Sequence, residues 1–283
     1  SHIIAAQLKK EFTIPWIADY RDTWTQNPET NFPLFRRFFE TKLEKRTLKS
    51  ADEIVTVSEK YAKDLKELHD RNIHVIPNGY TKLLKHQKID KSKFIISYTG
   101  MIYPEFQDIE RFAKAVRIVI ENGIIPRDKI EIRFYGNQIS LIEEVSKKYS
   151  LEGVIKAMGR VSRNKCYEVQ ASSQILLFFG WESEEKGGLS HLKFFEYISA
   201  QRPILISGGH QDAPLVKTGR DLKIGIGAFT KEELVNKLSD LYIQFKRNGQ
   251  VPYKGIKSKI WQQSYEARSK AYLRLMRISD EET

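Results

Sequence analysis

The sequence has 283 residues, a net charge of +11 and a single cysteine, Cys166, and 41% of its residues are hydrophobic. This length allows two domains of about 100–200 residues each, and the composition excludes a disordered or fibrous chain. One thiol excludes an internal disulfide framework and a zinc site of CxxC spacing, and it is typical of a reducing cytoplasm. The apolar runs stay far below the about 18 residues that a membrane-spanning helix needs, and residues 1–6 do not have the pattern of a secretory signal.

In the first 85 residues the pattern predicts three strands and three helices. The strands are Trp16–Tyr20, Glu53–Ser58 and His74–Pro77, and the helices are Ile3–Glu11, Pro33–Ser50 and Glu59–His69. Open sheets usually have about four to six strands, so three strands make a small sheet for an independent α/β domain. We therefore expect residues 1–85 to be a partial Rossmann-like domain without its first part, because the chain is a fragment or because the protein is naturally shortened.

Residues 86–250 alternate between apolar strands and amphipathic helices, and a lysine-rich linker at 82–93 leads into them. The predicted strands are Phe94–Thr99, Ile130–Tyr135, Val154–Met158, Gln174–Phe179, Pro203–Ser207 and Lys223–Ile226. The predicted helices are Asp108–Asn122, Ser140–Tyr149, Arg163–Ser172, His191–Gln201, Ala213–Lys217 and Lys231–Arg247. The strands lack strict polar alternation, which indicates a parallel sheet covered by helices on both faces. The alternation of strand and helix predicts a doubly wound, Rossmann-like domain.

A second break at Gly249–Gly255 precedes a last predicted helix, Ile256–Met276. We expect residues 251–283 to form a C-terminal segment whose helix packs back on the N-terminal domain. The sequence shows no internal repeat of fixed period and no low-complexity tract.

The residues that follow each strand are the candidates for a site, because ligands of open parallel sheets bind beyond the carboxyl ends of the strands. Gly100 follows the first strand of the second domain and either lets a ligand approach the backbone or is a simple turn glycine. Gly136 follows the next strand, where a nucleotide can lie against the backbone or Asn137 can cap a helix. Farther on, Arg160 suits a phosphate or a surface salt bridge, and Val161 suits a base.

The loop after the fourth strand of this domain is the most informative stretch. Gly187 and Gly188 can expose backbone N–H groups, and the loop leads into the N-terminus of a helix, whose partial positive charge suits a diphosphate. Lys193 adds a full charge in the first turn. Glu196 shares a face with Lys193, and its carboxylate can accept hydrogen bonds from ribose hydroxyls. Spacing alone leaves open the alternative of an ordinary surface Lys–Glu pair.

Four segments of the sequence carry recognisable motifs in order along the chain. They are 16–24 (WIADYRDTW), 51–58 (ADEIVTVS), 75–80 (VIPNGY) and 193–205 (KFFEYISAQRPIL). Together they resemble the motifs of family 4 glycosyltransferases with the GT-B fold, and the first resembles the version in a branch that acts on bacterial surface polysaccharides. The resemblance covers most of the chain and implies an α/β fold of two Rossmann-like domains with parallel sheets, the N-terminal one incomplete.

The resemblance also implies an activity and a set of site residues. The activity is retaining transfer of a sugar from a nucleotide diphosphate sugar to a polysaccharide or lipid-linked glycan acceptor, with no metal ion or other cofactor. The donor belongs to residues 86–250 and the acceptor mainly to residues 1–85. Carried over, Glu196 binds the ribose and Lys193 the diphosphate region. Gly187, Gly188 and Leu189 meet phosphate or sugar through backbone amides, and Gly100 lines the cleft.

Three positions of the donor site depart from the family's pattern. Counting back from Glu196, the first of two acidic residues in many relatives falls at Gly188. An Arg and a Lys that hold the diphosphate in many relatives fall at Met101 and Gln107. Diphosphate binding is therefore expected to rest on the helix N-terminus with its lysine, assisted by Lys186.

The acceptor side departs as well, since many relatives have a His where Arg21 stands. Arg21 and Asp22 are predicted to face the transferred sugar as catalytic residues. The alternative, which the sequence leaves open, is that both residues hold their loop in place.

The positive charge has a candidate use in the predicted helix Pro33–Ser50. This helix has four large apolar residues beside five basic ones, namely Phe35, Phe38, Phe39 and Leu43 beside Arg36, Arg37, Lys42, Lys45 and Arg46. A basic amphipathic helix with aromatic residues can lie on anionic lipid, which would place a cytoplasmic protein peripherally at the inner face of the membrane. Periodicity alone favours the other interpretation, that the aromatic residues pack into the N-terminal core.

Two other classes of function compete with an enzyme. A non-catalytic nucleotide-sugar-binding protein or partner subunit fits the departures from the motif and the short N-terminal domain. Nucleic-acid binding through the positive charge is not expected, because the sequence has no RRM, KH or helix-turn-helix motif.

Overall fold

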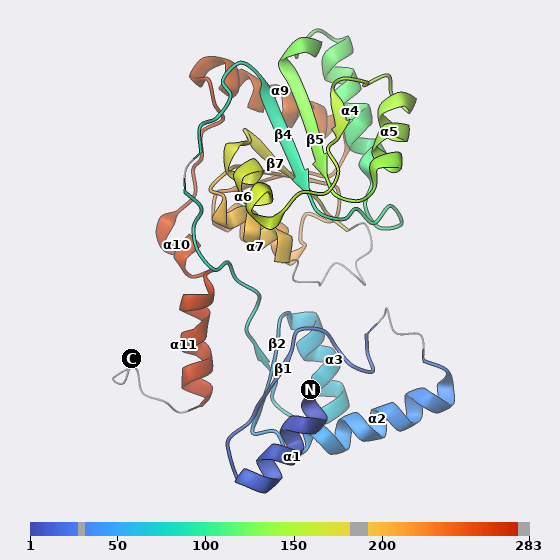
Figure 1. Cartoon of the computed structure of the whole chain (residues 1–283), viewed down its shortest axis with the longest axis vertical. Coiled ribbons are helices and arrows are strands. Elements are labelled where there is room, and N and C mark those ends of the chain that lie inside the picture. The colour runs from blue at the N-terminus through green and yellow to red at the C-terminus, as the bar shows by residue number, and fades with distance from the viewer. Residues whose placement is uncertain (28–31, 86, 182–191, 277–283) are drawn as a thin grey trace. The chain divides into compact units, whose positions relative to one another are not determined.

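The computed structural model describes residues 1–27, 32–85, 87–181 and 192–276 (Figure 1). The described chain divides into two compact units. Unit 1 contains residues 1–79 together with the stretch that starts at Tyr265, and unit 2 contains the described residues from Tyr80 to Ser264. Each unit is an α/β structure with its own parallel sheet.

Unit 1 is built on a three-stranded parallel sheet in the order β1-β2-β3. Its strands are β1 (Ile17–Tyr20), β2 (Glu53–Thr56) and β3 (His74–Val75), and its helices are α1 (His2–Phe12), α2 (Leu34–Leu48), α3 (Glu59–His69) and α11 (Tyr265–Leu275). The three strands and the first three helices lie where the sequence pattern predicts them.

A buried carboxylate organises the core of unit 1. Glu44 on α2 is fully buried, and it accepts hydrogen bonds from Tyr20 Oη (3.1 Å) and from both the backbone N (3.1 Å) and Oγ1 (2.5 Å) of Thr25. His69 Nε2 lies 3.5 Å from the same carboxylate. Burial acts to raise the pKa of Glu44, but the nearby His69 and the hydrogen bonds from Thr25 outweigh it and the pKa is lowered. The carboxylate therefore joins α2, the end of β1 and α3.

Unit 2 has a six-stranded parallel sheet in the order β6-β5-β4-β7-β8-β9. Its strands are β4 (Phe94–Thr99), β5 (Ile130–Tyr135), β6 (Ile155–Ala157), β7 (Ile175–Phe179), β8 (Ile204–Ser207) and β9 (Gly225–Ala228). Its helices are α4 (Ile109–Glu121), α5 (Ile139–Lys148), α6 (Arg163–Ser172), α7 (Leu192–Ser199), α8 (Pro214–Asp221), α9 (Lys231–Asn248) and α10 (Lys257–Trp261), with a short 3-10 turn, η1, at Arg127–Lys129. In chain order the strands read 3-2-1-4-5-6, the order of a dinucleotide-binding Rossmann sheet.

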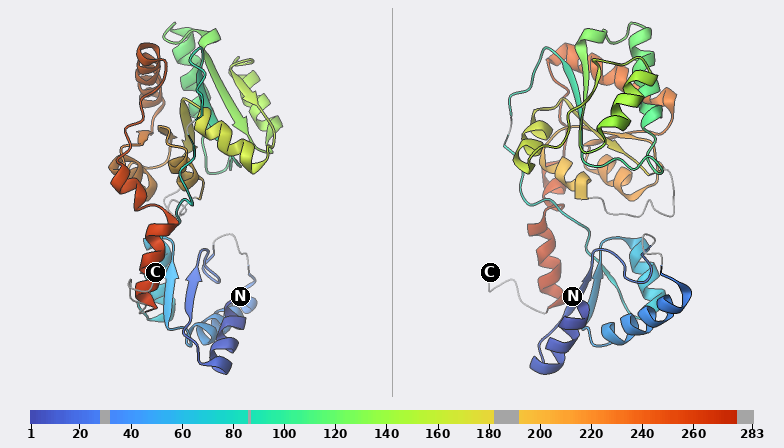
Figure 2. Two further views of the ribbon diagram at one scale, coloured as in Figure 1. Left: turned by 60° about the vertical axis from the view of Figure 1, so that its left-hand side comes forward. Right: turned by 45° about the vertical axis from the view of Figure 1, so that its right-hand side comes forward.

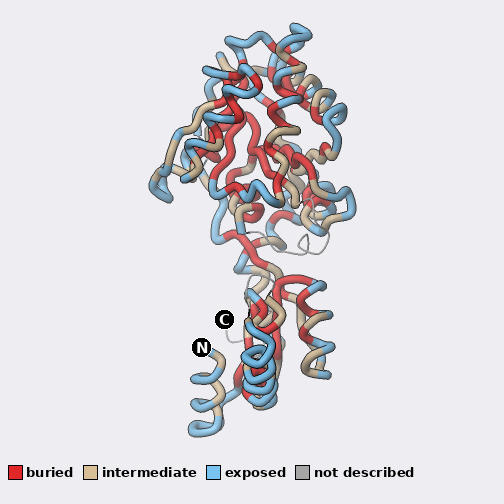
Figure 3. Tube along the Cα trace, turned by 90° about the vertical axis from the view of Figure 1, so that its right-hand side faces the viewer, coloured by how far each residue is buried: buried red, intermediate tan, exposed pale blue. Residues whose placement is uncertain are grey.

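The four inner strands of unit 2, β4, β5, β7 and β8, are buried on both faces, as their continuous apolar pattern predicts. All five residues of β7 are buried. Because side chains alternate between faces, Ile175, Leu177 and Phe179 pack into one hydrophobic cluster with α4 and α9. Leu176 and Phe178 pack into a second cluster, with α7 and α8. Helices cover both faces of the sheet (Figure 2), and the strands form the buried centre of the unit in Figure 3.

The last predicted helix, 256–276, is two helices in the structure. The chain leaves helical geometry after α10 because the carbonyl of Gln263 accepts a hydrogen bond from Tyr80 N at 3.1 Å and Ser264 forms a parallel bridge with Tyr80. Pairing with the segment at Tyr80 thus replaces one helical turn, and α11 starts anew at Tyr265. The final strand is also displaced, since β9 starts at Gly225 rather than at Lys223.

The interpretation that the aromatic residues of α2 pack into the core is wrong. Phe35 is 72% exposed, Phe39 66% and Phe38 56%. The buried residues of α2 are Glu44, Thr47 and Leu48, which all lie near its C-terminus. The helix therefore packs on unit 1 through its last turns, and its first turns present phenylalanine to the solvent.

We expect Glu44→Gln to destabilise unit 1 by about 1–3 kcal/mol, since the amide nitrogen cannot accept the bonds from Thr25 and leaves buried donors unpaired. In hydrogen–deuterium exchange, the amides of β1 and α3 should exchange about tenfold faster or more. Amides of β4 should exchange as in the parent chain.

Glu67→Gln, at an exposed position of the same unit, is the matched control and should change the stability of unit 1 by less than about 0.5 kcal/mol. Equal exchange of β1 and α3 in the two variants would show that the Glu44 network does not support the unit.

Candidate functional site

The site that the sequence predicts lies where the strand order of unit 2 reverses. β4 and β7 are the first and fourth strands of the unit and are direct neighbours, with Ile96 opposite Ile175. Ligands of doubly wound sheets bind beyond the carboxyl ends of strands at such a switch point. Gly100 follows β4, and α7 follows β7 in the chain, so both lie at this edge of the sheet.

The two faces of α7 separate the core residues of its motif from the polar ones. Phe194, Phe195 and Tyr197 are buried in the hydrophobic cluster below the helix. Tyr197 Oη also accepts a hydrogen bond from Thr99 N at 3.0 Å, which fixes the helix against the end of β4. Lys193 and Glu196, one turn apart, are left on the side of the strand ends.

A cavity of about 400 Å³ opens beside Glu196 at these strand ends. Its lining comes from the ends of β4, β5 and β6 and from α6 and α7, and comprises Thr99, Gly100, Met101, Tyr135, Gly136, Asn137, Arg160, Val161, Arg163, Cys166, Tyr167 and Glu196. The floor is backbone, because a Cβ on Gly136 would lie 2.4 Å from the carbonyl oxygen of Gly100. The cavity therefore offers peptide groups, two arginines and a carboxylate to one ligand.

The side chain of Lys193 reaches Gly100. A Cβ built on Gly100 would lie 2.9 Å from Lys193 Cε, and the backbone of Gly100 has φ +116°, which side chains rarely adopt. Lys193 Nζ donates to Met101 O at 3.3 Å and to Tyr98 Oη, and it lies 3.9 Å from the centre of the Tyr98 ring. Burial lowers the pKa of Lys193 to about 7, and Glu196 opposes the shift.

Glu196 has room for a ligand. Its side chain is 37% exposed and lies 3.8 Å from Arg163 Nη2. Burial raises the pKa of Glu196, while Arg163 and Gln170 act to lower it. A half-buried carboxylate whose ion pair with Arg163 is this long keeps acceptor capacity for hydroxyl groups.

The structure brings three predicted donor-site residues together: Gly100, Lys193 and Glu196. Lys186, Gly187, Gly188 and Leu189 are predicted donor residues that lie outside the described part of the chain.

Met101 and Gln107 stand where the family resemblance leads us to expect an Arg and a Lys on the diphosphate, and neither supplies a charge. Met101 is exposed at the rim. Gln107 is buried, and it accepts a bond from Tyr103 N (2.9 Å) and donates to Phe179 O (3.3 Å). Its amide therefore fixes the loop after β4, and Lys193 Nζ supplies a cation beside that loop, at Met101 O.

Three lining residues of α6 were not recognised from the sequence: Arg163, Cys166 and Tyr167. Arg163 donates from Nε to Tyr167 Oη at 2.6 Å, and its guanidinium faces Glu196. The position of Arg163 could have indicated its place in the site. It lies at the start of the helix that follows β6, and ligands of such sheets bind beyond the carboxyl ends of strands. Asn137 does not cap α5, whose N-cap residue is Gln138.

In unit 1, Arg21 is fixed in a polar cluster at the end of β1. Its Nε and Nη2 donate to Asp19 Oδ2 (3.0 and 2.8 Å), and its Nη1 donates to Ile76 O (3.3 Å) and Asn78 Oδ1 (3.2 Å). Tyr272 of α11 accepts from Arg21 Nη2 and donates to Asp19 Oδ2 at 3.0 Å. These contacts give Arg21 a role in holding its loop, one of the two alternatives that the sequence leaves open.

The other predicted catalytic residue is less constrained. Asp22 is exposed, and no residue in the described ranges forms an ion pair or hydrogen bond with it. Catalytic roles for Arg21 and Asp22 stay predictions.

No helix among the described residues is long and apolar enough to cross a membrane. No group of three or more His, Cys, Asp or Glu side chains among them is placed to hold a metal ion.

The fold, the strand order and the cavity at the switch point together define a GT-B type structure. Solved structures with this fold match across both units. TarM matches with a TM-score of 0.59 and 16% identity over 92% of this chain and 50% of that chain. The pneumococcal O-GlcNAc transferase GtfA, in complex with UDP and GlcNAc, matches with a TM-score of 0.58 and 15% identity over 84% of this chain and 47% of that chain. Sucrose-phosphate synthase from Thermosynechococcus elongatus matches with a TM-score of 0.59 and 14% identity over 98% of this chain and 70% of that chain.

A family match accompanies the fold: residues 1–81 match the family model Glycosyltransferase Family 4. No curated protein matches the sequence. At identities of 14–16% the solved structures show the fold, and the chain spans about half the length of TarM. The resemblance to family 4 glycosyltransferases with the GT-B fold is thereby confirmed.

We expect the affinity for a nucleotide diphosphate sugar to fall as pH rises. Lys193 has a pKa of about 7 in the free protein, and a bound diphosphate favours its charged form and so raises this pKa. Above pH 7 the lysine must gain a proton on binding, which weakens binding by up to about tenfold per pH unit. A nucleotide diphosphate sugar is a suitable probe because its diphosphate keeps a constant charge from pH 6 to about pH 9.

Calorimetric titration between these limits measures the effect. Lys193→Arg is the matched control, since an arginine stays charged throughout, and its pH profile should be flatter. Parallel profiles for the parent chain and Lys193→Arg would exclude Lys193 as the diphosphate ligand.

Proposed function

We propose that this chain acts as a glycosyltransferase that moves a sugar from a nucleotide diphosphate sugar to a glycan acceptor. The observation that carries the proposal is the placement of Lys193 and Glu196 on one face of α7, beside Gly100 and a cavity at the switch point of the sheet. The family 4 match of residues 1–81 supports the same activity. S. aureus TarM and GtfA are both described in complex with UDP, which favours a nucleotide ligand here.

In the proposed mechanism the chain stabilises charge rather than supplying a nucleophile. The leaving diphosphate gains negative charge as the bond to the sugar breaks, and the Lys193 ammonium lies at the strand ends where that charge develops. Desolvation around Lys193 strengthens this attraction. Glu196 accepts hydrogen bonds from the ribose hydroxyls and fixes the nucleotide, so that the diphosphate meets Lys193.

The finer parts of the proposal follow the family resemblance. We propose that transfer retains the configuration at the anomeric carbon, that the glycosyl centre becomes oxocarbenium-like as in glycoside hydrolysis, and that no metal ion is needed. The acceptor is proposed to be a polysaccharide or lipid-linked glycan bound by unit 1. The Asp19–Arg21–Tyr272 cluster holds the β1 loop there, and Asp22 on that loop is exposed.

We also propose peripheral binding to an anionic membrane, which suits a cytoplasmic enzyme with a lipid-linked acceptor. The first turns of α2 expose Leu34, Phe35, Phe38 and Phe39. Basic residues accompany them, and Lys42 lies 4.2 Å from the centre of the Phe38 ring. Exposed aromatic rings with lysine and arginine on one helix match the chemistry of an anionic lipid interface.

Turnover with a panel of UDP-, GDP- and TDP-sugars tests the activity. We expect one donor to be hydrolysed or transferred, with no loss of rate in EDTA. Glu196→Ala and Lys193→Ala should each lower kcat/KM by about tenfold or more, because each removes a charge-assisted contact to the donor. Glu168→Ala, an exposed carboxylate on α6, is the matched control and should keep the parent rate.

The alternative function has its own outcome in this assay. Saturable donor binding without any turnover would favour a non-catalytic nucleotide-sugar-binding protein. Equal kcat/KM for Glu196→Ala, Lys193→Ala and the parent chain would remove the proposed donor site.

Cosedimentation with vesicles of phosphatidylcholine and phosphatidylglycerol tests the membrane proposal. The parent chain should bind, and the double variant F38S/F39S should bind at least about tenfold more weakly, because it loses about 1.5–3 kcal/mol of apolar burial per ring. Ile243→Ser, at an exposed apolar position of α9, should bind as the parent does. Equal binding of the double variant and the parent would contradict a membrane role for α2.

A further inference from the structure

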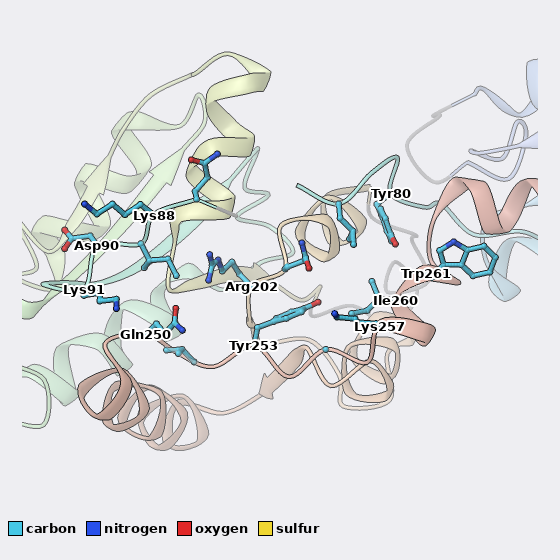
Figure 4. Close-up of a pocket in the computed structure, with 16 residues that line it drawn as sticks. Tyr80, Lys88, Asp90, Lys91, Arg202, Gln250, Tyr253, Lys257, Ile260 and Trp261 are labelled. Atoms are coloured by element: carbon cyan, nitrogen blue, oxygen red, sulfur yellow. The ribbon is translucent and has the colours of Figure 1, made fainter. Parts of the chain in front are cut away.

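A second and larger cavity lies at the opposite edge of the unit 2 sheet. It has a volume of about 1570 Å³ (Figure 4). Its lining includes residues that precede strands, namely Lys88–Lys91 before β4 and Gln201–Arg202 before β8. The segment after α9 adds Gln250, Val251 and Tyr253, and α10 adds Lys257, Ile260 and Trp261. The cavity beside Glu196, called the donor cavity from here on, follows the carboxyl ends of strands, so the two cavities occupy opposite edges. Nothing in the proposed sugar transfer uses this second cavity.

Arg202 is the central feature of this cavity. The residue is only 7% exposed, and its Nε donates to Ala171 O at 2.9 Å. No carboxylate in the described chain forms a salt bridge with it. In Figure 4 its side chain lies between those of Lys88 and Asp90 on one side and those of Gln250 and Tyr253 on the other. A buried guanidinium without a carboxylate carries an uncompensated desolvation cost, and burial accordingly lowers the pKa of Arg202.

The other charged residues of the lining add to this positive centre. Lys88, Lys91 and Lys257 line the cavity, and the lining contains one acidic residue, Asp90. Asp90 Oδ1 already accepts bonds from Ser92 N (2.8 Å) and Ser92 Oγ (2.6 Å). Four cations and one engaged carboxylate give the cavity a net positive charge, so its ligand is an anion.

The wall beside Arg202 is held by buried hydrogen bonds. Gln174, which is 1% exposed, donates to Asp90 O at 3.0 Å and accepts from Val251 N at 3.1 Å. Farther along, Gln201 donates to Leu84 O at 3.2 Å. These contacts fasten the linker and the segment after α9 to the sheet edge. The cavity is therefore a formed part of unit 2, with walls set by its own core.

The remaining wall is aromatic and apolar. It includes Tyr80, Tyr253, Ile260 and Trp261. The tip of the Tyr253 ring lies over Gly255, where a Cβ would come within 2.5 Å of the Tyr253 hydroxyl. That hydroxyl is buried and has no hydrogen-bond partner among the described residues. Aromatic faces and an unpaired hydroxyl suit an organic body, either the ring of a sugar or an acyl chain, attached to the anion.

We propose that this cavity binds an organic phosphate, with the phosphate group on Arg202 and the organic body against Tyr253 and its aromatic neighbours. Arginine presents paired N–H donors that match phosphate oxygens, and such charge-assisted bonds are about twice as strong as neutral ones. A phosphate ester in soluble form and the phosphate headgroup of a lipid share this chemistry. The site is independent of the donor cavity and of the proposed transfer activity.

Calorimetric titration of the full chain tests the proposal with glucose 6-phosphate, short-chain dihexanoyl phosphatidic acid and inorganic phosphate as probes and glucose as the uncharged reference. We expect at least one of the two organic phosphates to bind more tightly than inorganic phosphate, and glucose not to bind. Arg202→Gln should weaken that binding by about tenfold or more, because a charge-assisted bond is lost. Arg117→Gln, an exposed arginine of α4 paired with Glu121, removes the same charge and should leave binding unchanged.

Two further variants keep the test decisive if Arg202→Gln does not fold. Lys257→Gln removes a charge and Tyr253→Phe removes a hydroxyl from the lining, and each should weaken the same probe. Lys193→Ala in the donor cavity should not. Preference for glucose 6-phosphate supports a soluble ester, and preference for phosphatidic acid supports a lipid phosphate. Absence of binding by both organic phosphates, or binding that depends on Lys193 and not on the residues of this cavity, would overturn the proposal.

Discussion

The parallel pairing of β4 with β7 is the contact on which the candidate donor site depends. It sets Ile96 opposite Ile175 at the centre of the sheet, although the two strands lie far apart in the sequence. Each strand sends its chain out at the same edge, and the residue after β4, Gly100, meets a side chain of the helix after β7, Lys193. The position favours glycine because its backbone has φ +116°, and a side chain there would also displace the lysine. The site is thus a consequence of strand order, and the loops only complete it.

The excess positive charge is divided among physically different settings. On α2 it is exposed beside aromatic rings, where it is solvated and free to meet a surface. At the strand ends of unit 2 it includes Lys193, whose charged form is disfavoured by burial. At the opposite edge of the sheet it includes Arg202, which is buried without a carboxylate. The buried charges of Lys193 and Arg202 raise the free energy of the unliganded protein, and a bound anion would lower it.

Residues whose roles depend on spacing along one element could be predicted from the sequence. Lys193 and Glu196 are one helical turn apart, so their common face follows from the period of the helix. Arg163 was missed because its approach to Glu196 depends on how α6 lies beside α7. Arg202 stands within a recognised motif, yet its burial and lack of a carboxylate depend on the linker and on the segment after α9. Periodicity likewise favoured a buried face for α2, whereas its buried residues all lie from Glu44 onward.

The sequence by itself determined the α/β class, the order of the elements, the parallel sheet of unit 2 and the resemblance to family 4 glycosyltransferases. These properties follow from hydrophobic period, turn residues and motifs, which are encoded over short stretches of chain. The tertiary structure decided which strand ends meet, that Arg21 is held by Tyr272 of α11, where the helix after Gly255 breaks, and that a second cavity surrounds Arg202. Each of these depends on contacts between residues distant in sequence, whose energies no local pattern contains.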